Sequence, residues 1–186
     1  GRSDVWQEFV LNSNKHLHTP LTNNMGMKTI IAYDYTTRSK VTKDVTAVEP
    51  YAEWKRIRLA TFAEREWLFL LMVAGALAIL TRIVVRLDDW KTLVLGVGLI
   101  PIGAELTCYY YSIVLAFGLL WKDHPWTGVA LAALAWLTCE CAWMWDWYDD
   151  SFAWMSVLVV VYVFAVYLQL WMSRAADITT SVDEVK

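Results

Sequence analysis

Two carboxylates fall inside apolar stretches of the sequence, and both have sulfur-bearing residues close by. Glu105 is followed by Cys108, and Glu140 is followed by Cys141 and Met144. An ionisable group at membrane depth costs at least about 2.5 kcal/mol, so each carboxylate is a candidate functional residue. Thiolate and thioether ligands suit Cu(I), and the five residues together define a hypothetical carboxylate–sulfur metal site.

The alternative is that both carboxylates are structural. They would then be protonated or hydrogen-bonded to the tyrosines and serine of residues 109–112, and would hold helices together. On one helix, Glu105 would share a face with Cys108 and Tyr109. No histidine accompanies the two acids at this depth, which favours the structural alternative. We therefore predict neither a metal nor a catalytic residue in this chain, and no cofactor apart from bound lipid.

A third acidic group lies near the end of the chain. Asp146, Asp149 and Asp150 form a turn between tryptophans, where a divalent cation or a basic partner loop could bind. A solvated turn between two helices is the more common arrangement, and it is our prediction. The sequence contains no glycine-rich phosphate loop, nucleophile elbow or haem-attachment motif.

The elements that position these residues are four long apolar stretches. Residues 67–85, 102–121, 126–145 and 153–172 each run for about 20 residues, the length that crosses a hydrocarbon core of about 30 Å as a helix. Only a helix satisfies all its backbone hydrogen bonds within one segment at that depth. The sequence therefore predicts an all-α integral membrane protein with about four transmembrane helices between residues 67 and 172.

Residues 90–121 do not fit one regular crossing. As one helix they would extend about 48 Å, which is too long for one upright span, while they are too few for two. Pro101, with glycines on both sides, provides a natural break. We predict a short half-helix over 91–100 that leads through the kink into a full span, with a single bent and tilted helix as the alternative.

The regions outside the spans are polar or amphipathic. Residues 1–50 form an extramembrane region that begins with a helix capped by Ser3, on which Trp6, Phe9 and Val10 share a face. Within this region, residues 28–35 are the only β-like run, and residues 36–48 form a polar, mobile excursion. An interfacial amphipathic helix is predicted over 51–66, running directly into the first span, and residues 173–186 form a polar tail.

Charge and cysteine usage exclude some functional classes. The net charge is −3 and neither half of the chain carries the large basic excess of a nucleic-acid-binding protein. Three cysteines, all inside predicted spans, argue against a disulfide framework. The lysines and arginines of the short loops favour both chain ends on the cytoplasmic side.

Two motifs are similar to those of a known family. The segment VWQEFVLNSNKHLHTPLTNNMG (residues 5–26) and the pattern P-x-x-x-E-L-T-x-Y-Y-Y (residues 101–111) resemble the C-terminal portion of bacterial GT-C-type glycosyltransferases that depend on polyprenyl-phosphate-mannose. The resemblance implies a bacterial inner membrane and a periplasmic location for residues 1–66, opposite to the loop-charge expectation. Its catalytic acid would lie in a first extramembrane loop that has no counterpart here, so no catalytic residue is carried over.

Three functions follow as hypotheses. The first is a non-catalytic membrane subunit, or fragment of one, whose helices pack against other membrane-protein chains. The second is the C-terminal part of a lipid-linked sugar transferase. The third is an ion or proton transporter component that uses Glu105 beside a broken helix, since helices broken in this way often line binding cavities.

Overall fold

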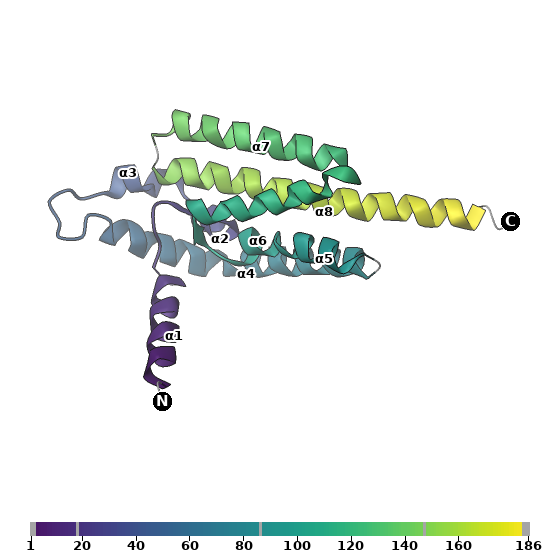
Figure 1. The fold of residues 1–186 in the computed structure, drawn as a ribbon. Helices are drawn as coiled ribbons and strands as arrows, with labels where there is room; N and C mark the ends of the chain where they lie inside the picture. Colours follow the sequence, from purple (N-terminus) through teal and green to yellow (C-terminus); the bar gives the residue numbers. More distant parts are fainter. Residues whose placement is uncertain (1–2, 18, 86, 147, 184–186) are drawn as a thin grey trace.

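The structure is a computed structural model that describes residues 3–17, 19–85, 87–146 and 148–183. Helices make up most of it (Figure 1), which confirms the all-α fold. Among the described residues, three helices are long and apolar enough to cross a membrane, whereas about four were expected. These are α4 (Ala52–Val84), α7 (Pro125–Met144) and α8 (Asp149–Asp183).

Helix α4 is continuous from the predicted helix 51–66 into the first predicted span. Its 33 residues extend for about 50 Å, well beyond the thickness of a hydrocarbon core of about 30 Å. Only 17% of its most apolar stretch is buried. Most residues of this stretch are therefore at least partly exposed on the surface of the bundle.

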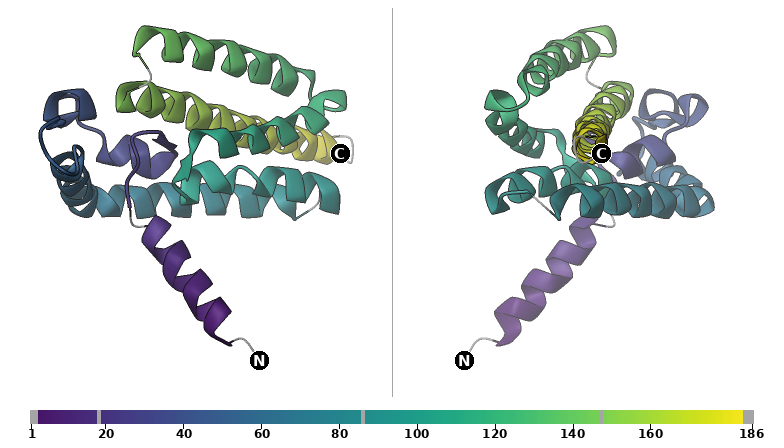
Figure 2. Two further views of the ribbon diagram at one scale, coloured as in Figure 1. Left: turned by 60° about the vertical axis from the view of Figure 1, so that its left-hand side comes forward. Right: turned by 90° about the vertical axis from the view of Figure 1, so that its right-hand side faces the viewer.

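Helix α8 is the central helix of the bundle. In its most apolar stretch 61% of the residues are buried, compared with 22% in that of α7. Helix α7 packs beside α8 along one side (Figures 1 and 2). The two helices are joined by a tight turn in which Asp146 has a positive φ of 52°, a conformation that aspartate tolerates better than most residues. Helix α8 continues to Asp183, so the predicted tail 173–186 begins as an extension of the helix.

Residues 89–122 fold into two antiparallel legs. The first leg contains α5 (Asp89–Gly96) and α6 (Leu99–Gly103). The chain then reverses, and β2 (Leu106–Thr107) leads into the second leg, η2 (Cys108–Lys122), which is a 3-10 helix. Figure 1 shows the first leg beside α4, and the second leg packs mainly against α7.

The predictions for this region were wrong in detail. The break lies between α5 and α6, at residues 97–98, and Pro101 sits within the first turn of α6, where its missing N–H removes no helical bond. Residues 102–107 are not part of a long helix. Two legs fit because a 3-10 helix rises about 2.0 Å per residue, so the 15 residues of η2 extend for about 30 Å.

Every third residue of η2 faces the interior. Tyr111, Val114, Phe117 and Leu120 are its buried residues, and positions three apart lie in line along a 3-10 helix. The Phe117 ring meets the edge of the Tyr162 ring of α8, with centroids 5.6 Å apart. This stripe therefore attaches the second leg to the central helix.

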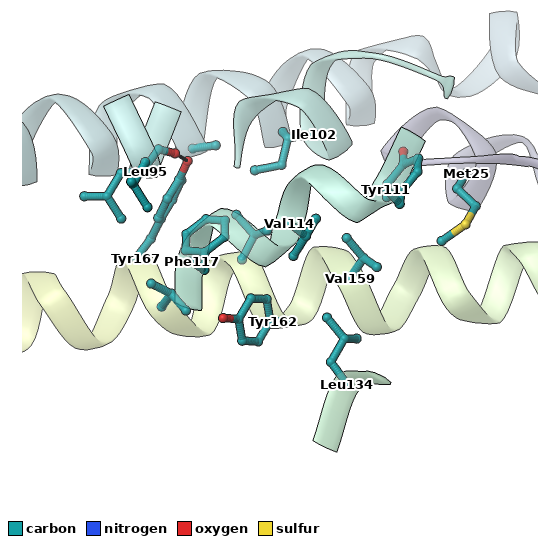
Figure 3. Packing of buried hydrophobic residues seen from close by; sticks show 14 of the residues in the cluster. Met25, Leu95, Ile102, Tyr111, Val114, Phe117, Leu134, Val159, Tyr162 and Tyr167 are labelled. Carbon is teal, nitrogen blue, oxygen red and sulfur yellow. Dashed lines mark hydrogen bonds between the residues drawn. The ribbon is translucent and has the colours of Figure 1, made fainter. Parts of the chain in front are cut away.

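The core lies between α8 and the two legs (Figure 3). Tyr167 is fully buried and donates a hydrogen bond to the carbonyl of Leu95 in α5, 2.6 Å away. Gly98 allows this close approach. A Cβ atom there would lie 2.6 Å from the Tyr167 hydroxyl and 2.7 Å from Val163 Cγ1, closer than atoms pack.

The segment between α1 (Ser3–Leu17) and α4 packs onto the bundle. It contains the two-residue strand β1 (Asn24–Met25), the short helices α2 (Met27–Ala32) and α3 (Ser39–Thr42), and the 3-10 turn η1 (Tyr35–Thr37). Strand β1 pairs antiparallel with β2, with Asn24 opposite Thr107. Helix α1 itself projects away from the bundle (Figure 1).

Two predictions for this segment were wrong. Residues 28–35 are mostly helical, because α2 packs against α4, α6 and α8 and tertiary packing overrides the β propensity of the run. Residues 36–48 are not a simple polar excursion, since they contain the end of η1 and all of α3, and Ser39 is fully buried.

Candidate functional site: two buried polar clusters and an apolar cavity

The first polar cluster is built around Glu105, which lies in the reversal between α6 and β2. Its carboxylate accepts hydrogen bonds from Thr29 Oγ1 at 3.2 Å and Arg58 Nη2 at 3.1 Å, and lies 3.5 Å from Lys28 Nζ. The side chains of Glu105 and Arg58 are each 5% exposed. This Glu105 cluster joins α2, α4 and the reversal through charged groups that are mostly removed from water.

Aromatic rings support both cations of the Glu105 cluster. The Arg58 guanidinium lies over Trp54, 5.1 Å from the ring centroid, and the Lys28 ammonium lies over Phe62 at 5.0 Å. A cation is attracted to the negative face of an aromatic ring, and the attraction strengthens as water is excluded. The rings thus help to stabilise a cluster that has two cations and one anion.

The hydrogen-bond partners of Glu105 differ from those that the sequence predicts for a structural carboxylate. Glu105 lies outside any helix, so it does not share a helical face with Cys108 and Tyr109. The hydrogen-bond partners found are on α2 and α4, not among residues 109–112. Burial of the carboxylate among donors from other segments is what holds these segments together.

The second polar cluster forms at the start of α8. Asp149 accepts hydrogen bonds from the backbone N–H of Ser39 at 3.0 Å, from Ser39 Oγ at 2.6 Å and from Trp54 Nε1 at 2.9 Å. Its neighbour Asp150 accepts a hydrogen bond from the Tyr33 hydroxyl and lies 3.7 Å from Arg38 Nε. We call these residues the Asp149 cluster.

The prediction of a solvated acidic turn was wrong for two of its three residues. Asp149 and Asp150 are only 2% and 5% exposed, because they belong to the first turn of α8 and are covered by the residues that contact them, Tyr33, Arg38, Ser39 and Trp54. Burial, and next the hydrogen bond to Asp150, raise the pKa of Tyr33. Asp146 is exposed as predicted and lies 3.7 Å from Lys40.

An apolar cavity of about 570 Å³ lies between η2, α7 and α8. Tyr111 lines it, and the hydroxyl of this residue points away toward Gly26. Cavities of this size hold small-molecule ligands in many proteins. The lining is mostly aliphatic and aromatic: Met25, Cys108, Tyr109, Tyr111, Ser112, Val114, Leu115, Leu131, Leu134, Ala135, Thr138, Cys139, Ala142, Trp143, Phe152, Met155 and Val159.

The structure does not bring the five hypothetical metal ligands together. Glu105 is engaged by its own cluster, and Cys108 lines the apolar cavity. Glu140 and Met144 are exposed on α7, whereas Cys141 is buried. Within the described part of the chain, no three His, Cys, Asp or Glu side chains are arranged so that they could hold a metal ion.

Sequence reasoning missed the partners of both clusters. Lys28, Tyr33 and Ser39 fall in a segment without regular periodicity, and nothing in their spacing points to residues some seventy to more than a hundred positions away. Arg58 falls in the predicted amphipathic helix 51–66, where arginines are expected on the polar face. The one available signal was Trp54, four residues before it, because an aromatic neighbour at this spacing can cover a buried cation.

The chemistry that these groups can perform is limited by their burial. Ser39 donates its hydroxyl hydrogen to Asp149, but it is fully buried and no substrate can reach it.

No protein-family model, curated protein or solved structure matches this chain.

Proposed function

We propose that this chain is a non-catalytic, membrane-embedded subunit, or a fragment of one, that packs against other membrane-protein chains. The observation that supports the proposal is the exposed carboxylate of Glu140. It lies on α7, which is long and apolar enough to cross a membrane, about one turn before the end of the helix. Its side chain is exposed, and it makes no ion pair or hydrogen bond with the described residues.

An exposed carboxylate on such a helix is costly in lipid and is best explained by a partner. Charged residues in membrane spans usually face other protein groups, pairing with charges or hydrogen-bond donors. The partner we propose is a helix of another chain that offers a basic or donor side chain to Glu140. The low burial of α7 and α4 leaves ample surface for such packing.

The two buried clusters support a structural role for the other charged groups. Glu105, Asp149 and Asp150 all pair with groups of this chain. A role in holding segments of the chain together therefore explains each of the three. We also propose that η2 is a fourth crossing, since its length of about 30 Å matches a hydrocarbon core. The location that we propose is the bacterial inner membrane, in keeping with the family resemblance of residues 5–26 and 101–111.

Extraction of native membranes tests the membrane location. Alkaline carbonate removes proteins held by surface charge, whereas helices inserted in the bilayer resist it. We expect the chain to remain in the pellet. Its release into the supernatant would contradict the proposal as a whole.

Charge reversal at Glu140 tests the assembly. In mild detergent, the mass of the native protein, measured with the bound detergent subtracted, should be well above the 21.4 kDa of this chain. Glu140→Lys should reduce that mass, because the partner's donor would face a cation. Glu64→Lys is the matched control, since Glu64 is exposed in the part of α4 before the apolar stretch. A native protein that elutes as a monomer would overturn the proposal.

The apolar cavity favours a second candidate, the C-terminal part of a lipid-linked sugar transferase, because it could accommodate the hydrocarbon chain of such a substrate. Ala135→Trp would fill the cavity, whereas Ala132→Trp, on the exposed side of α7, would not. Transfer of sugar from polyprenyl-phosphate-mannose that is lost only in Ala135→Trp would support this candidate. Transport through Glu105 has no such support, because three side chains already engage its carboxylate.

A further inference from the structure

We propose that α1 lies flat in the interface between membrane and water, with one face in the acyl-chain boundary. Val5, Trp6, Phe9 and Val10 fall on one side of α1, at the spacing that forms a stripe on a helix. All four are more than half exposed, and Trp6 is 72% exposed. Nothing in the described part of the chain covers this apolar stripe, and we propose that lipid covers it.

The direction of α1 points to a bilayer surface. In Figure 1, α4, α7 and α8 lie along nearly the same axis, with α7 antiparallel to the other two, whereas α1 runs across them and away from the bundle, and both views in Figure 2 agree. If the long helices lie along the membrane normal, α1 is close to the membrane plane. This inference therefore rests on the membrane location proposed above, and extends it to a helix that does not span.

The position of α1 along the bundle places it at the level of an interface. It leaves the bundle near the end at which α7 and α8 are joined (Figures 1 and 2). At that end, Trp145 and Trp154 stack with ring centroids 5.8 Å apart, and tryptophans gather where hydrocarbon meets headgroups. The charged Asp149 cluster lies there as well, which marks the boundary of the apolar region.

The polar side of α1 fits this placement. It carries Asp4, Glu8 and Lys15, which would face water while the apolar stripe faces lipid. The helix has no basic excess, so we expect it to bind a zwitterionic bilayer through apolar burial and not through attraction to anionic lipids. Leu11, which is also exposed, is the one apolar residue that falls on the polar side.

Nitroxide labels on opposite faces of α1 test the proposal in full-length protein reconstituted into phosphatidylcholine vesicles. The three native cysteines are replaced by alanine or serine, and the label is attached in turn to Trp6→Cys, Phe9→Cys, Glu8→Cys and Lys15→Cys. Accessibility to oxygen, which concentrates in lipid, is compared with accessibility to a water-soluble nickel complex. Val161→Cys, exposed on α8, serves as the reference for a label within a span.

We expect the ratio of oxygen to nickel accessibility to be several-fold higher at positions 6 and 9 than at 8 and 15. Equal nickel accessibility at all four positions, with position 161 still in lipid, would show that α1 is free in water and would overturn the inference alone. Protection of positions 6 and 9 from both reagents would overturn it in favour of a protein partner. Nickel accessibility at position 161 would instead contradict the membrane location itself.

Discussion

Ser39 and Asp149 are 110 residues apart in the chain and are joined by three short contacts. Both the backbone N–H and the hydroxyl of Ser39 donate to the Asp149 carboxylate, at 3.0 Å and 2.6 Å. Because each residue begins a helix, α3 and α8 are linked at their N-termini, where an anion is favoured by the helix dipoles. The Asp149 carboxylate is thus one of the groups that hold the N-terminal segment against the central helix.

Asp149→Asn should weaken this link strongly. The asparagine amide would direct a donor group at atoms that are themselves donors, and hydrogen bonds to a charged acceptor contribute about 1.5–3 kcal/mol each. We expect the free energy of unfolding in mild detergent to fall by about 3 kcal/mol. Asp146→Asn is the matched control, because Asp146 is exposed in the preceding turn. Equal stability of the two variants would contradict the account of the Asp149 cluster.

Glu105→Gln should also destabilise the fold. The substitution leaves Arg58 buried without its anion, and removal of one partner of a buried ion pair costs about 3–5 kcal/mol. Glu140→Gln, at an exposed position, should leave the isolated chain nearly unchanged. The double variant Glu105→Gln/Arg58→Met should recover part of the loss. Thermal unfolding of the four proteins measures this, and a mild effect of Glu105→Gln alone would show that the pairing is unimportant.

Gly98→Ala should disturb the core, whereas Gly96→Ala should not. The added methyl group at position 98 would overlap the Tyr167 hydroxyl, while a methyl at position 96 meets nothing within 4 Å. Overpacking of this kind costs about 1–3 kcal/mol. We expect a lower midpoint of thermal unfolding only for Gly98→Ala. Equal midpoints of thermal unfolding for Gly98→Ala and Gly96→Ala would argue against this clash.

Stability should fall at alkaline pH in part through Tyr33. Its pKa is raised in the folded chain by burial and then by Asp150, so the neutral phenol is the favoured form. Below about pH 10 the unfolded tyrosine is neutral as well, and the contribution of Tyr33 is complete. Above that pH the unfolded chain releases a proton that the folded chain retains, and stability declines. Tyr33→Phe should show a smaller decline between pH 9 and 11 than the native chain.

The sequence predicts the long helices well and the polar clusters poorly. Length and hydropathy are sufficient for α4, α7 and α8, because each contains a continuous apolar run. The 3-10 conformation of η2 could not be predicted. This segment is apolar on nearly all sides, so the spacing of three between its buried residues does not stand out in the sequence. Arg58 could not be distinguished from its exposed neighbour Arg56, because burial here is decided by contacts with Glu105, 47 residues away.

The 3-10 conformation of η2 fixes the distance between the two ends of this segment. One end is held by the pairing of Thr107 with Asn24, and just beyond the other end Asp123 contacts Lys91. Rewinding its 15 residues into an α-helix would shorten it by about 7 Å and would turn Phe117 and Leu120 out of line with Tyr111. Insertion or deletion of one residue would shift the two ends by about 2 Å and rotate half of the stripe by a third of a turn. The spacing between the ends of the bundle is thus set by residue count, and sequences that build this fold must conserve that count.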